Sequence, residues 1–417
     1  MKISYKKLWK LLIDRDLKKA DLARKANLST YTINKMNSND NINIETIGKI
    51  CLALNCKIDD ILDVIDEEHI ALDENNFEIL SNDIVVAVYK DNNLIIKDKS
   101  RLPLFLLNNS NAKRWLETRA IDSHRTNSRL LKKIVRLKEK DDLSTVIFVN
   151  GATITDNYWI RPINSLIKYQ DIKFLSDYFS SLALNGDFNN FVEAYNKKDS
   201  RTPELTNTGS FEKCWKLINN RWWMYKVASK EEMFSELFIY NLGKELNFDM
   251  AHYEKGEGYI KSLDFTNNNQ FNFEPASSFL GDNEDYLFVI EQLNKIYPNA
   301  IKDYIKMIFL DTICFNVDRH TNNFGLLRDA INGEIIGLAP NFDNNMALIS
   351  RGYKENNNSD LLIRLFNEVL EKYPNFKEYI PFINEEILEK VYLETNIEVD
   401  KDKVIKMILN RYSLIKV

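Results

Sequence analysis

The stretch N-V-D-R-H-T-N-N-F-G, from Asn316 to Gly325, carries the strongest signal in this chain of 417 residues. Asp318 and Asn323 lie five positions apart, and Asp343 follows twenty positions later, behind a short apolar run. Carboxylate and amide oxygens are ligands that Mg²⁺ accepts, and a carboxylate can also orient a hydroxyl group toward a phosphate. Phosphoryl transfer needs little more from a protein than this positioning and charge stabilisation. The three side chains therefore indicate a phosphoryl-transfer site.

The order and spacing of these residues are similar to those of protein-kinase-like enzymes. In that resemblance Asp318 is the catalytic base, and Asn323 and Asp343 hold Mg²⁺. Each residue taken alone would more often be an N-cap or turn residue in a loop. Two asparagines and an arginine–histidine pair around Asp318 are an unusual way to build a turn, so we favour the catalytic interpretation and take His320 as a brace of the loop.

The segment upstream predicts a strand pair followed by a helix. C-W-K-L-I-N-N-R-W-W-M-Y-K-V (214–227) alternates around an Asn-Asn turn. Ser229 with Glu232 three residues later is a capping box, which predicts the start of a helix. Lys226 near the end of the second strand and Glu236 in the helix are placed like the lysine–glutamate pair that fixes the ATP phosphates in kinases.

The segment L-T-N-T-G-S-F-E-K (205–213) precedes this strand pair, where kinases keep a glycine-rich loop. It has a single glycine, Gly209, and would by itself indicate a plain turn. The backbone N–H groups of the loop and the hydroxyls of Thr206, Thr208 and Ser210 can still reach phosphate oxygens. We therefore expect ATP contacts from Thr208, Gly209 and Ser210, together with Lys226.

Residues 1–66 predict five short helices with apolar faces. Asn27-Leu28-Ser29 predicts a tight turn between the second and third, since Asn tolerates the left-handed conformation and Ser29 is a good N-cap. The segment resembles the helix-turn-helix domain of the Cro/CI-like repressors. That resemblance implies that a third helix, about Thr30 to Asn37, enters the major groove of DNA.

The implied base and phosphate contacts of this domain are Lys19, Thr30, Tyr31, Thr32, Asn34 and Lys35. One departure concerns the second helix, which the family usually opens with Thr-Gln and this chain with Lys18-Lys19. A helical docking or dimerisation domain that no longer binds DNA is therefore the alternative.

The features after residue 200 together resemble the HipA-like serine/threonine kinases of bacterial toxin–antitoxin and persistence modules. The shared features are the single-glycine loop followed by a lysine (209–213), the stretch 316–325 and a D-F-D-like metal motif, which here reads N-F-D (341–343). The resemblance implies ATP and Mg²⁺ as cofactors and a protein as substrate.

The same resemblance implies two further features. A loop hydroxyl can be autophosphorylated in the family, and Thr206 fits that position first and Thr208 second. The backbone near Ile260 and Leu263 is the expected adenine hinge. The family's DNA-binding antitoxin is normally a separate protein, whereas here a similar domain is fused to the kinase, which raises the effective concentration of the two modules. Repressors of this type bind two half-sites as dimers, so we expect a homodimer on a double-stranded operator.

Composition changes divide the chain into five parts. The expected parts are a helix-turn-helix domain (1–66), an acidic linker (67–76), an α+β middle domain (77–165), a kinase N-lobe (166–295) and a kinase C-lobe (296–417). The expected fold class is therefore α+β, with a bilobed protein-kinase-like, HipA-type body preceded by an all-α domain.

Within the middle domain, Ile84 to Lys97 predicts a hairpin around Asp91. A helical stretch from about Asn111 to Lys138 follows, and it is rich in basic residues. We interpret these residues as a solvated helix face, with a contact to DNA or to a second subunit as the alternative. They are Arg114, Arg119, Arg125, Arg129, Lys132, Lys133, Arg136 and Lys138.

Composition excludes several classes of protein. With 44% hydrophobic and 28% charged residues the chain is globular, and a net charge of −5 does not suit a non-specific nucleic-acid binder. The four cysteines show no CxxC spacing, and the four histidines form no metal motif. No apolar run reaches the ~18 residues of a membrane span. We expect a reduced, cytoplasmic protein without a membrane segment.

The leading hypothesis is an ATP- and Mg²⁺-dependent protein serine/threonine kinase fused to its DNA-binding regulator, in a toxin–antitoxin or stress-regulatory role. A DNA-binding transcriptional regulator with a nucleotide-sensing, catalytically silent kinase body is the first alternative. A phosphotransferase that acts on a small molecule is the second, because it would use the same base and metal ligands.

Overall fold

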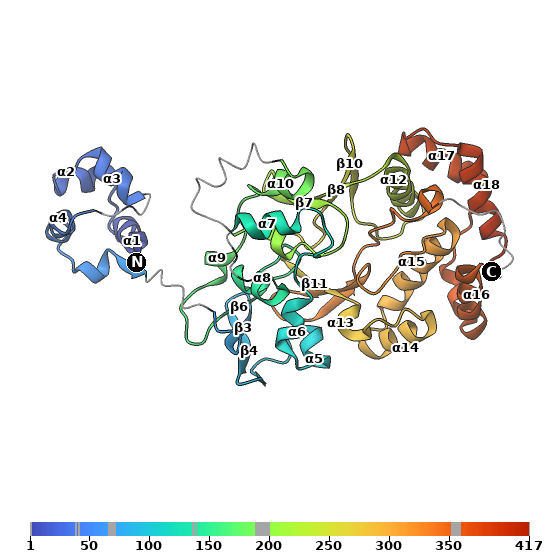
Figure 1. The fold of residues 1–417 in the computed structure, drawn as a ribbon, viewed down its shortest axis with the longest axis horizontal. Coiled ribbons are helices and arrows are strands. Elements are labelled where there is room, and N and C mark those ends of the chain that lie inside the picture. The colour runs from blue at the N-terminus through green and yellow to red at the C-terminus, as the bar shows by residue number, and fades with distance from the viewer. Residues whose placement is uncertain are drawn as a thin grey trace. The chain divides into compact units, whose positions relative to one another are not determined.

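The computed structural model describes residues 2–37, 40, 42–65, 72–135, 137, 139, 141–187, 201–351 and 360–416. The chain divides into two compact units, Met1–Asp73 and Glu74–Val417, and each is described by itself (Figure 1). The boundary falls inside the segment predicted to be a linker, of which residues 67–71 lie outside the described part. Among the helices of the described residues, none is long and apolar enough to cross a membrane.

The first unit is a small helical domain with a core of its own. Its elements are β1 (Lys2–Ser4), α1 (Lys6–Asp14), α2 (Lys19–Lys25), α3 (Thr30–Asn37), α4 (Ile44–Leu54), the 3-10 turn η1 (Ile58–Asp60) and β2 (Asp63–Ile65). Asn27 between α2 and α3 is left-handed, with φ 51°, and the Ser29 side chain accepts the Thr32 N–H. The turn and its cap are confirmed. The predicted fifth helix is wrong, because a single 3-10 turn leads into β2, which pairs antiparallel with β1.

The second unit begins with an antiparallel sheet in the order β5-β4-β3-β6. Its strands are β3 (Asn76–Ser81), β4 (Ile84–Lys90), β5 (Asn93–Ile96) and β6 (Tyr158–Pro162). Asp91 and Asn92 form the left-handed turn between β4 and β5, so the predicted hairpin is confirmed. The helices of this part are α5 (Leu104–Asn108), α6 (Ala112–Glu117), α7 (Ser128–Ile134) and α8 (Asp142–Phe148).

The basic stretch of this part is not one long helix, and it is a solvated face only in part, since Arg114, Arg129 and Lys133 are exposed. It folds as the two short helices α6 and α7, and three of its basic side chains are buried. Arg119 pairs with Asp156 at 2.7 Å, and Lys132 lies 3.5 Å from a carboxylate oxygen of Asp142. Arg125 reaches into the second sheet of the unit, as described below. The prediction failed because charge alone does not report burial, and residues 136 and 138 lie outside the described part.

The second sheet, in the order β7-β8-β10-β9, provides the strand pair predicted from the sequence. Its strands are β7 (Lys213–Ile218), β8 (Arg221–Val227), β9 (Tyr253–Lys255) and β10 (Tyr259–Leu263). Asn219 and Asn220 both have positive φ, as a two-residue turn between β7 and β8 requires. Helix α12 (Lys230–Glu245) follows, and the Ser229–Glu232 capping box at its start is confirmed. Before β7 lie α9 (Tyr169–Ile172), α10 (Ser180–Asn185) and the 3-10 turn η2 (Pro203–Thr206).

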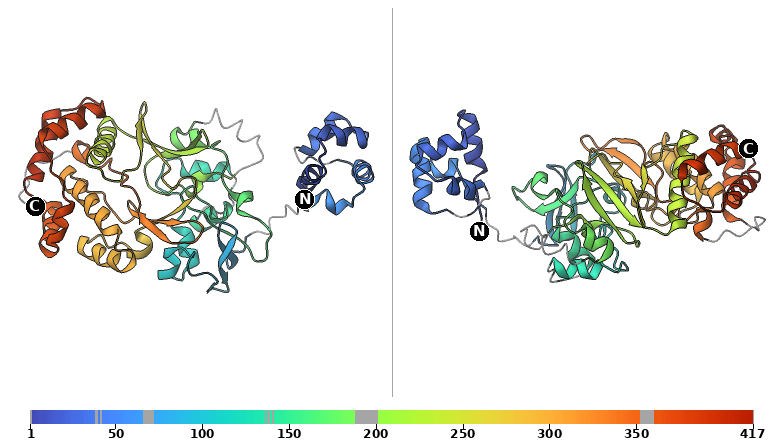
Figure 2. Two further views of the ribbon diagram at one scale, coloured as in Figure 1. Left: turned by 180° about the vertical axis from the view of Figure 1, so that it is seen from behind. Right: turned by 90° about the horizontal axis from the view of Figure 1, so that it is seen from above.

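The rest of the unit is mainly helical, with a third sheet in the order β11-β12-β13. Its elements are β11 (Phe271–Pro275), α13 (Ser277–Leu280), α14 (Tyr286–Ile296), α15 (Ala300–Cys314), β12 (Gly325–Asp329), β13 (Ile335–Leu338), η3 (Leu348–Arg351), α16 (Leu361–Lys372), η4 (Pro374–Tyr379), α17 (Glu385–Thr395) and α18 (Lys401–Tyr412). Helices α16 and α18 both pack on α15, at the end of the unit that carries the C-terminus (Figures 1 and 2). The predicted α+β class is confirmed.

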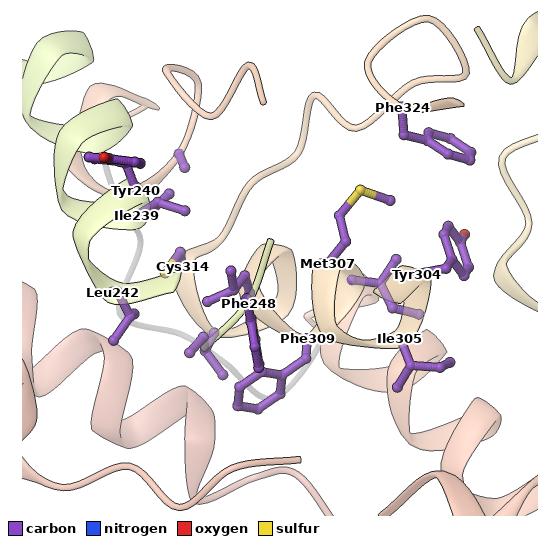
Figure 3. Packing of buried hydrophobic residues seen from close by; sticks show 14 of the residues in the cluster. Ile239, Tyr240, Leu242, Phe248, Tyr304, Ile305, Met307, Phe309, Cys314 and Phe324 are labelled. Carbon is purple, nitrogen blue, oxygen red and sulfur yellow. The ribbon is translucent and has the colours of Figure 1, made fainter. Parts of the chain in front are cut away.

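Helix α15 is the centre of the largest apolar core among the described residues and ends just before the stretch 316–325. Its residues Tyr304, Met307 and Phe309 lie among side chains from α12 and from Phe324 (Figure 3). The Phe324 ring packs on Tyr304 with ring centroids 5.5 Å apart. The stretch that carries the predicted chemistry is therefore held directly by the core.

Candidate active site

Lys226 and Asp343 form the central ion pair of the site. The Nζ atom of Lys226, on β8, lies 2.6 Å from Oδ1 of Asp343. Burial opposes the charge on both groups, but their mutual attraction outweighs it. The pKa of Lys226 is therefore raised above its ordinary value, and the pKa of Asp343 is lowered. Asp343 also has a left-handed backbone, with φ 60°, a conformation that is uncommon for a residue with a side chain and is often found at functional sites.

Glu236 lies beside this pair but forms no ion pair with Lys226 within the described residues. Its Oε1 accepts hydrogen bonds from the backbone N–H and the side-chain amide of Asn344, at 2.8 and 3.2 Å. The Tyr253 hydroxyl bonds to the same carboxylate, and its oxygen accepts the N–H of Asp343 at 3.0 Å. Burial first, then the charge of Asp343, raises the pKa of Glu236 to about 7. The predicted direct contact with Lys226 is wrong, and Glu236 instead fixes the segment that carries Asp343.

The loop after α15 presents Asp318 and Asn323. The Asp318 N–H donates to Oδ1 of Asn316 at 3.2 Å, and within the described residues no hydrogen bond or ion pair occupies its half-buried carboxylate. The Asn323 side-chain nitrogen donates to the backbone oxygen of Asp318 at 3.0 Å. This bond fixes the orientation of the amide and leaves its Oδ1 as the open group. The loop therefore offers one free carboxylate and one free amide oxygen.

Arg319 joins the two halves of the site, a role that the sequence did not indicate. Its guanidinium makes a bidentate ion pair with Asp311 of α15, with both N–O distances 2.9 Å. The third nitrogen, Nη1, takes no part in this ion pair and donates to the backbone oxygens of Asn323 and Phe342, at 2.7 and 2.6 Å. Nη1 thus binds the backbone of Asn323, a predicted metal ligand, and the backbone of Phe342, which directly precedes the second predicted ligand. The segments of Asn323 and Asp343 consequently lie side by side.

Further bonds from Nη2 of Arg319 reach the side-chain oxygens of Asn341 and Asn344, at 2.9 and 2.6 Å. Arg319 is buried, and Asp311 is fully buried. Arg319 belongs to the stretch 316–325 that the sequence analysis singled out. Asp311 lies in a largely apolar helix, and no sequence motif predicted a role for it. The Asn341 that replaces the first acid of the metal motif thus has a structural partner in Arg319.

The donor set suits a magnesium–nucleotide complex. Within the described residues, Oδ1 of Asn323 and Oδ2 of Asp343 accept no hydrogen bond, so both are open to a cation. Mg²⁺ in such sites takes one or two protein oxygens, with water and substrate phosphates as its other ligands. The described part of the chain contains no cluster of three or more His, Cys, Asp or Glu side chains that would hold a metal by themselves. Asn323 and Asp343 therefore fit Mg²⁺ that arrives with a nucleotide.

The predicted phosphate loop has an exposed tip and a buried stem. Thr208, Gly209 and Ser210 are exposed, and Gly209 has φ 95°, which a residue with a side chain rarely adopts. Thr206 is only 7% exposed, and its hydroxyl donates to the backbone oxygen of Ala152 at 2.7 Å. In this conformation the hydroxyl of Thr206, the first predicted phosphorylation site, is therefore enclosed, whereas Thr208, the second, is exposed.

Two buried residues anchor the stem of this loop. Arg125 donates to the backbone oxygens of Asn207 and Lys213, which flank the tip on either side. Glu204 accepts the Trp215 N–H at 2.7 Å and the Asn207 side-chain amide at 3.0 Å. The sequence connected neither residue with the loop: Arg125 was one of several basic residues and acts through backbone oxygens 82 and 88 positions away, and Glu204 acts through the Trp215 N–H and the Asn207 side chain.

Lys213 is a second lysine near the central pair. It stands opposite Lys226 in the β7–β8 register. Burial first, then Lys226, lowers the pKa of Lys213 to about 7. An added Cβ atom at Gly209 would meet its Nζ at 2.5 Å, so the absence of a side chain at Gly209 makes room for this lysine.

The predicted adenine hinge is not open in this structure. Strand β10 pairs with β8 on one edge and with β9 on the other, and both pairings include Ile260. The Leu263 N–H donates to the backbone oxygen of His252 at 2.9 Å. Adenine could reach the Leu263 amide only by displacing this bond. The hinge near Ile260 and Leu263 therefore stays a prediction, and the strand pairing that occupies these backbone groups could not be read from composition.

In the first unit, the predicted DNA-contact residues share the exposed side of α3 and the start of α2. Thr30, Tyr31 and Asn34 are exposed, whereas Ile33 and Met36 of the same helix are buried. Lys35 lies 5.0 Å from the centroid of the Tyr31 ring. The alternation of exposed and buried positions leaves one polar face of α3 toward solvent.

Two of the predicted contact residues are held in place by neighbours. Lys19 donates to the Asn37 side chain at 2.6 Å and lies 4.5 Å above the Trp9 ring, and the Thr32 hydroxyl lies 3.0 Å from that of Ser29. A family model described as the Cro/C1-type HTH DNA-binding domain matches residues 7–67. Residues 7–67 are a Cro/C1-type helix-turn-helix domain.

A short part of the chain is also similar to a solved protein. The transcriptional regulator VanUg is 42% identical over the aligned part, which covers 88% of VanUg and 16% of this chain, with a TM-score of 0.16. A search of curated protein sequences found no match to the chain.

Two further solved chains are similar to a larger part. One belongs to the Shewanella oneidensis MR-1 toxin–antitoxin complex of HipA, HipB and operator DNA: it is 10% identical, with 82% of this chain and 99% of that chain covered and a TM-score of 0.46. The other is the Helicobacter pylori proinflammatory kinase CtkA, 19% identical, with 48% and 94% covered and a TM-score of 0.32. These likenesses assign no residue a role, and the chemistry proposed below rests on the geometry of the site.

Proposed function

We propose that the second unit is an ATP- and Mg²⁺-dependent protein serine/threonine kinase of HipA type, regulated by the Cro/C1-type domain fused to it. The observation that carries this proposal is the arrangement around Arg319. That one guanidinium holds the loop of Asp318 and Asn323 against the segment of Asp343, which in turn pairs with Lys226. The side chains that we propose as base, metal ligands and phosphate-binding cation thus come from three parts of the sequence, and their contacts support the proposal.

Each of these residues has a distinct role in the proposed phosphoryl transfer. Lys226 exchanges Asp343 for a nucleotide phosphate and neutralises part of its charge. Mg²⁺, when bound with ATP at Asn323 and Asp343, would supply charge stabilisation at the transferred phosphoryl group. The free carboxylate of Asp318 accepts the proton of the substrate hydroxyl and orients that hydroxyl for in-line attack. The backbone N–H groups of the exposed loop tip around Gly209 cover the phosphates.

The decisive experiment compares the intact mass of the wild type and of Asp318→Asn after incubation with Mg-ATP. A working kinase gains about 80 Da per phosphate, the mass of one phosphoryl group, in the wild type alone. Glu334→Gln, at an exposed carboxylate on the turn before β13, is the matched control and should behave as the wild type. No gain in either protein and no phosphate on added serine peptides, starting from unphosphorylated material, would contradict a kinase and favour a nucleotide-sensing regulator. Phosphate found only on added sugars or antibiotics would instead identify a small-molecule phosphotransferase.

We further propose that the Cro/C1-type domain binds a double-stranded operator as part of a homodimer. The polar, exposed face of α3 supports this, because a helix of this kind reads base edges in the major groove while its neighbours contact phosphate. Selection of bound duplexes from a random library, followed by titration of wild type and Asn34→Ala, tests it. Tight binding of one sequence that Asn34→Ala weakens selectively is expected. Binding that is uniform across sequences would contradict specific recognition.

A further inference from the structure

A hollow of about 580 Å³ lies next to the loop of the candidate base. The start of α14, the loop after α15 and the start of α16 line it. Asn316, Val317 and Arg319, which flank Asp318 on both sides in sequence, belong to this lining. A ligand in the hollow would therefore lie close to the hydroxyl that Asp318 orients.

The wall of the hollow is largely apolar and partly open to solvent. Tyr286, Phe315, Leu362 and Leu365 contribute to it, and Val317 and Leu361 remain 51% and 53% exposed. Exposed large apolar side chains that gather in one concave place commonly mark a binding surface. The hollow thus offers room for at least one apolar side chain of a ligand.

The rim of the hollow has a negative net charge when the side chains that form ion pairs with each other are counted as neutral. Arg319 is neutralised by Asp311, and Asp360 is paired with Arg411. Glu284 and Asp285, in the exposed loop before α14, have no ion pair within the described residues. A cationic group is therefore attracted to this rim, whereas an anionic ligand such as a nucleotide phosphate is repelled.

We propose that this hollow binds the part of a protein substrate that adjoins the phosphorylated serine or threonine, and that it selects an apolar residue together with a lysine or arginine. The inference rests on the proposed kinase function and names its substrate class. The loop that carries Asp318 also forms one wall of the hollow. Because Arg319 fixes that loop to α15, a substrate chain seated here has its hydroxyl held at a constant distance from the base.

The test uses the full chain and two synthetic serine peptides that share one leucine and differ only in flanking lysine or glutamate residues. The wild type should phosphorylate the lysine peptide about three- to tenfold faster, the range expected for rim charges that are partly screened. Glu284→Lys should abolish or reverse this ratio, which a merely structural effect would not do. Glu398→Lys, at an exposed carboxylate between α17 and α18, should keep the wild-type ratio.

A second measurement needs no variant. Raising the salt concentration should reduce the preference of the wild type for the lysine peptide, because screening weakens rim electrostatics. Equal rates for both peptides at low salt, in protein that phosphorylates itself, would overturn the inference and leave the kinase proposal standing. No phosphorylation of the peptides or of the protein itself would overturn the kinase proposal, and the inference with it.

Discussion

The ammonium group of Lys226 and the carboxylate of Asp343 lie 2.6 Å apart although 117 positions separate them in the sequence. Under the proposed function, each partner is also the group that a phosphate or Mg²⁺ would engage. Binding of Mg-ATP would then replace one partly buried ion pair with two new ones, and the charge of the site would stay balanced.

Replacement of Lys226 by methionine should remove the charge balance between Lys226 and Asp343. The methionine preserves most of the apolar stem but leaves Asp343 without its cation, so we expect kcat/KM for ATP to fall about 10²- to 10³-fold. Initial rates of phosphate transfer at several ATP concentrations check this. Lys216→Met, on the neighbouring strand β7, is the matched control and should retain activity within a few-fold. A fully active Lys226→Met variant would contradict the assignment.

We call Arg319 with its partners Asp311, Asn323 and Phe342 the clamp. Loss of the clamp should affect stability as well as activity. Breaking its ion pair with Asp311, whose side chains are 4% and 1% exposed, leaves a buried charge unpaired and costs about 3–5 kcal/mol of the free energy of unfolding. Urea unfolding of Asp311→Asn measures this cost. Glu368→Gln, which breaks the exposed pair of Arg364 with Glu368, should cost no more than about 1 kcal/mol. Similar losses in both variants would count against the clamp.

Arg125 should act on nucleotide binding through the loop stem. Arg125→Met removes both of its bonds to the backbone that flanks Gly209, so the loop tip loses its fixed position and the KM for ATP should rise about tenfold. Arg129→Met, at an exposed position of α7 four residues on, is the control. Because a buried arginine also stabilises the fold, the assay temperature must lie below the unfolding transition of both variants. A change in kcat without a change in KM would argue against a positioning role.

Phosphorylation of the loop, if the chain modifies itself, should fall on Thr208. Its side chain is exposed, whereas the Thr206 hydroxyl is buried and bonded to Ala152. Peptide mapping after incubation with Mg-ATP should find the loop phosphate on Thr208, and Thr208→Ala should abolish it. Phosphate on Thr206 would mean that the 3-10 turn η2 opens before the reaction.

The buried carboxyl group of Glu204 should make stability depend on pH. Burial raises its pKa to about 7, from an ordinary value of 4.5, so between these values the folded state binds more protons than the unfolded state. The free energy of unfolding therefore falls as pH rises from about 4.5 to 7, by at most about 1.4 kcal/mol per pH unit, and then levels off. Glu204→Gln should lack this contribution. Identical pH slopes for wild type and variant, in urea titrations at pH 5 and pH 7, would refute it.

Much of the fold near the site could be predicted because its signals are local. The Asn219-Asn220 turn, the Ser229–Glu232 capping box and the tight turn at Asn27 each depend on a few adjacent residues, and all three are confirmed. The order of the site residues could also be read, since it depends on spacing within short loops. The structure then brings Asp318, Asn323 and Asp343 together as the spacing suggested.

The contacts that failed prediction are those between distant segments. Lys226 bonds to Asp343 and not to Glu236. Asp311 pairs with Arg319, and Arg125 bonds to the backbone of Asn207, so the role of each depends on a distant segment that the fold brings to it. The basic stretch illustrates the same limit, because Arg119 carries its charge into the interior toward Asp156. Composition reports which groups exist, whereas burial and pairing depend on the whole fold.

The clamp of Arg319 also decides when the site loses its conformational freedom. Because one guanidinium already fixes the segments of Asn323 and Asp343, the entropy of ordering them is lost during folding and not again when a ligand binds. Under the proposed function, a nucleotide would meet two segments that are already ordered, and the loop tip around Gly209 would be the part left to adjust. The ordering of those two segments would then not reduce the affinity for nucleotide.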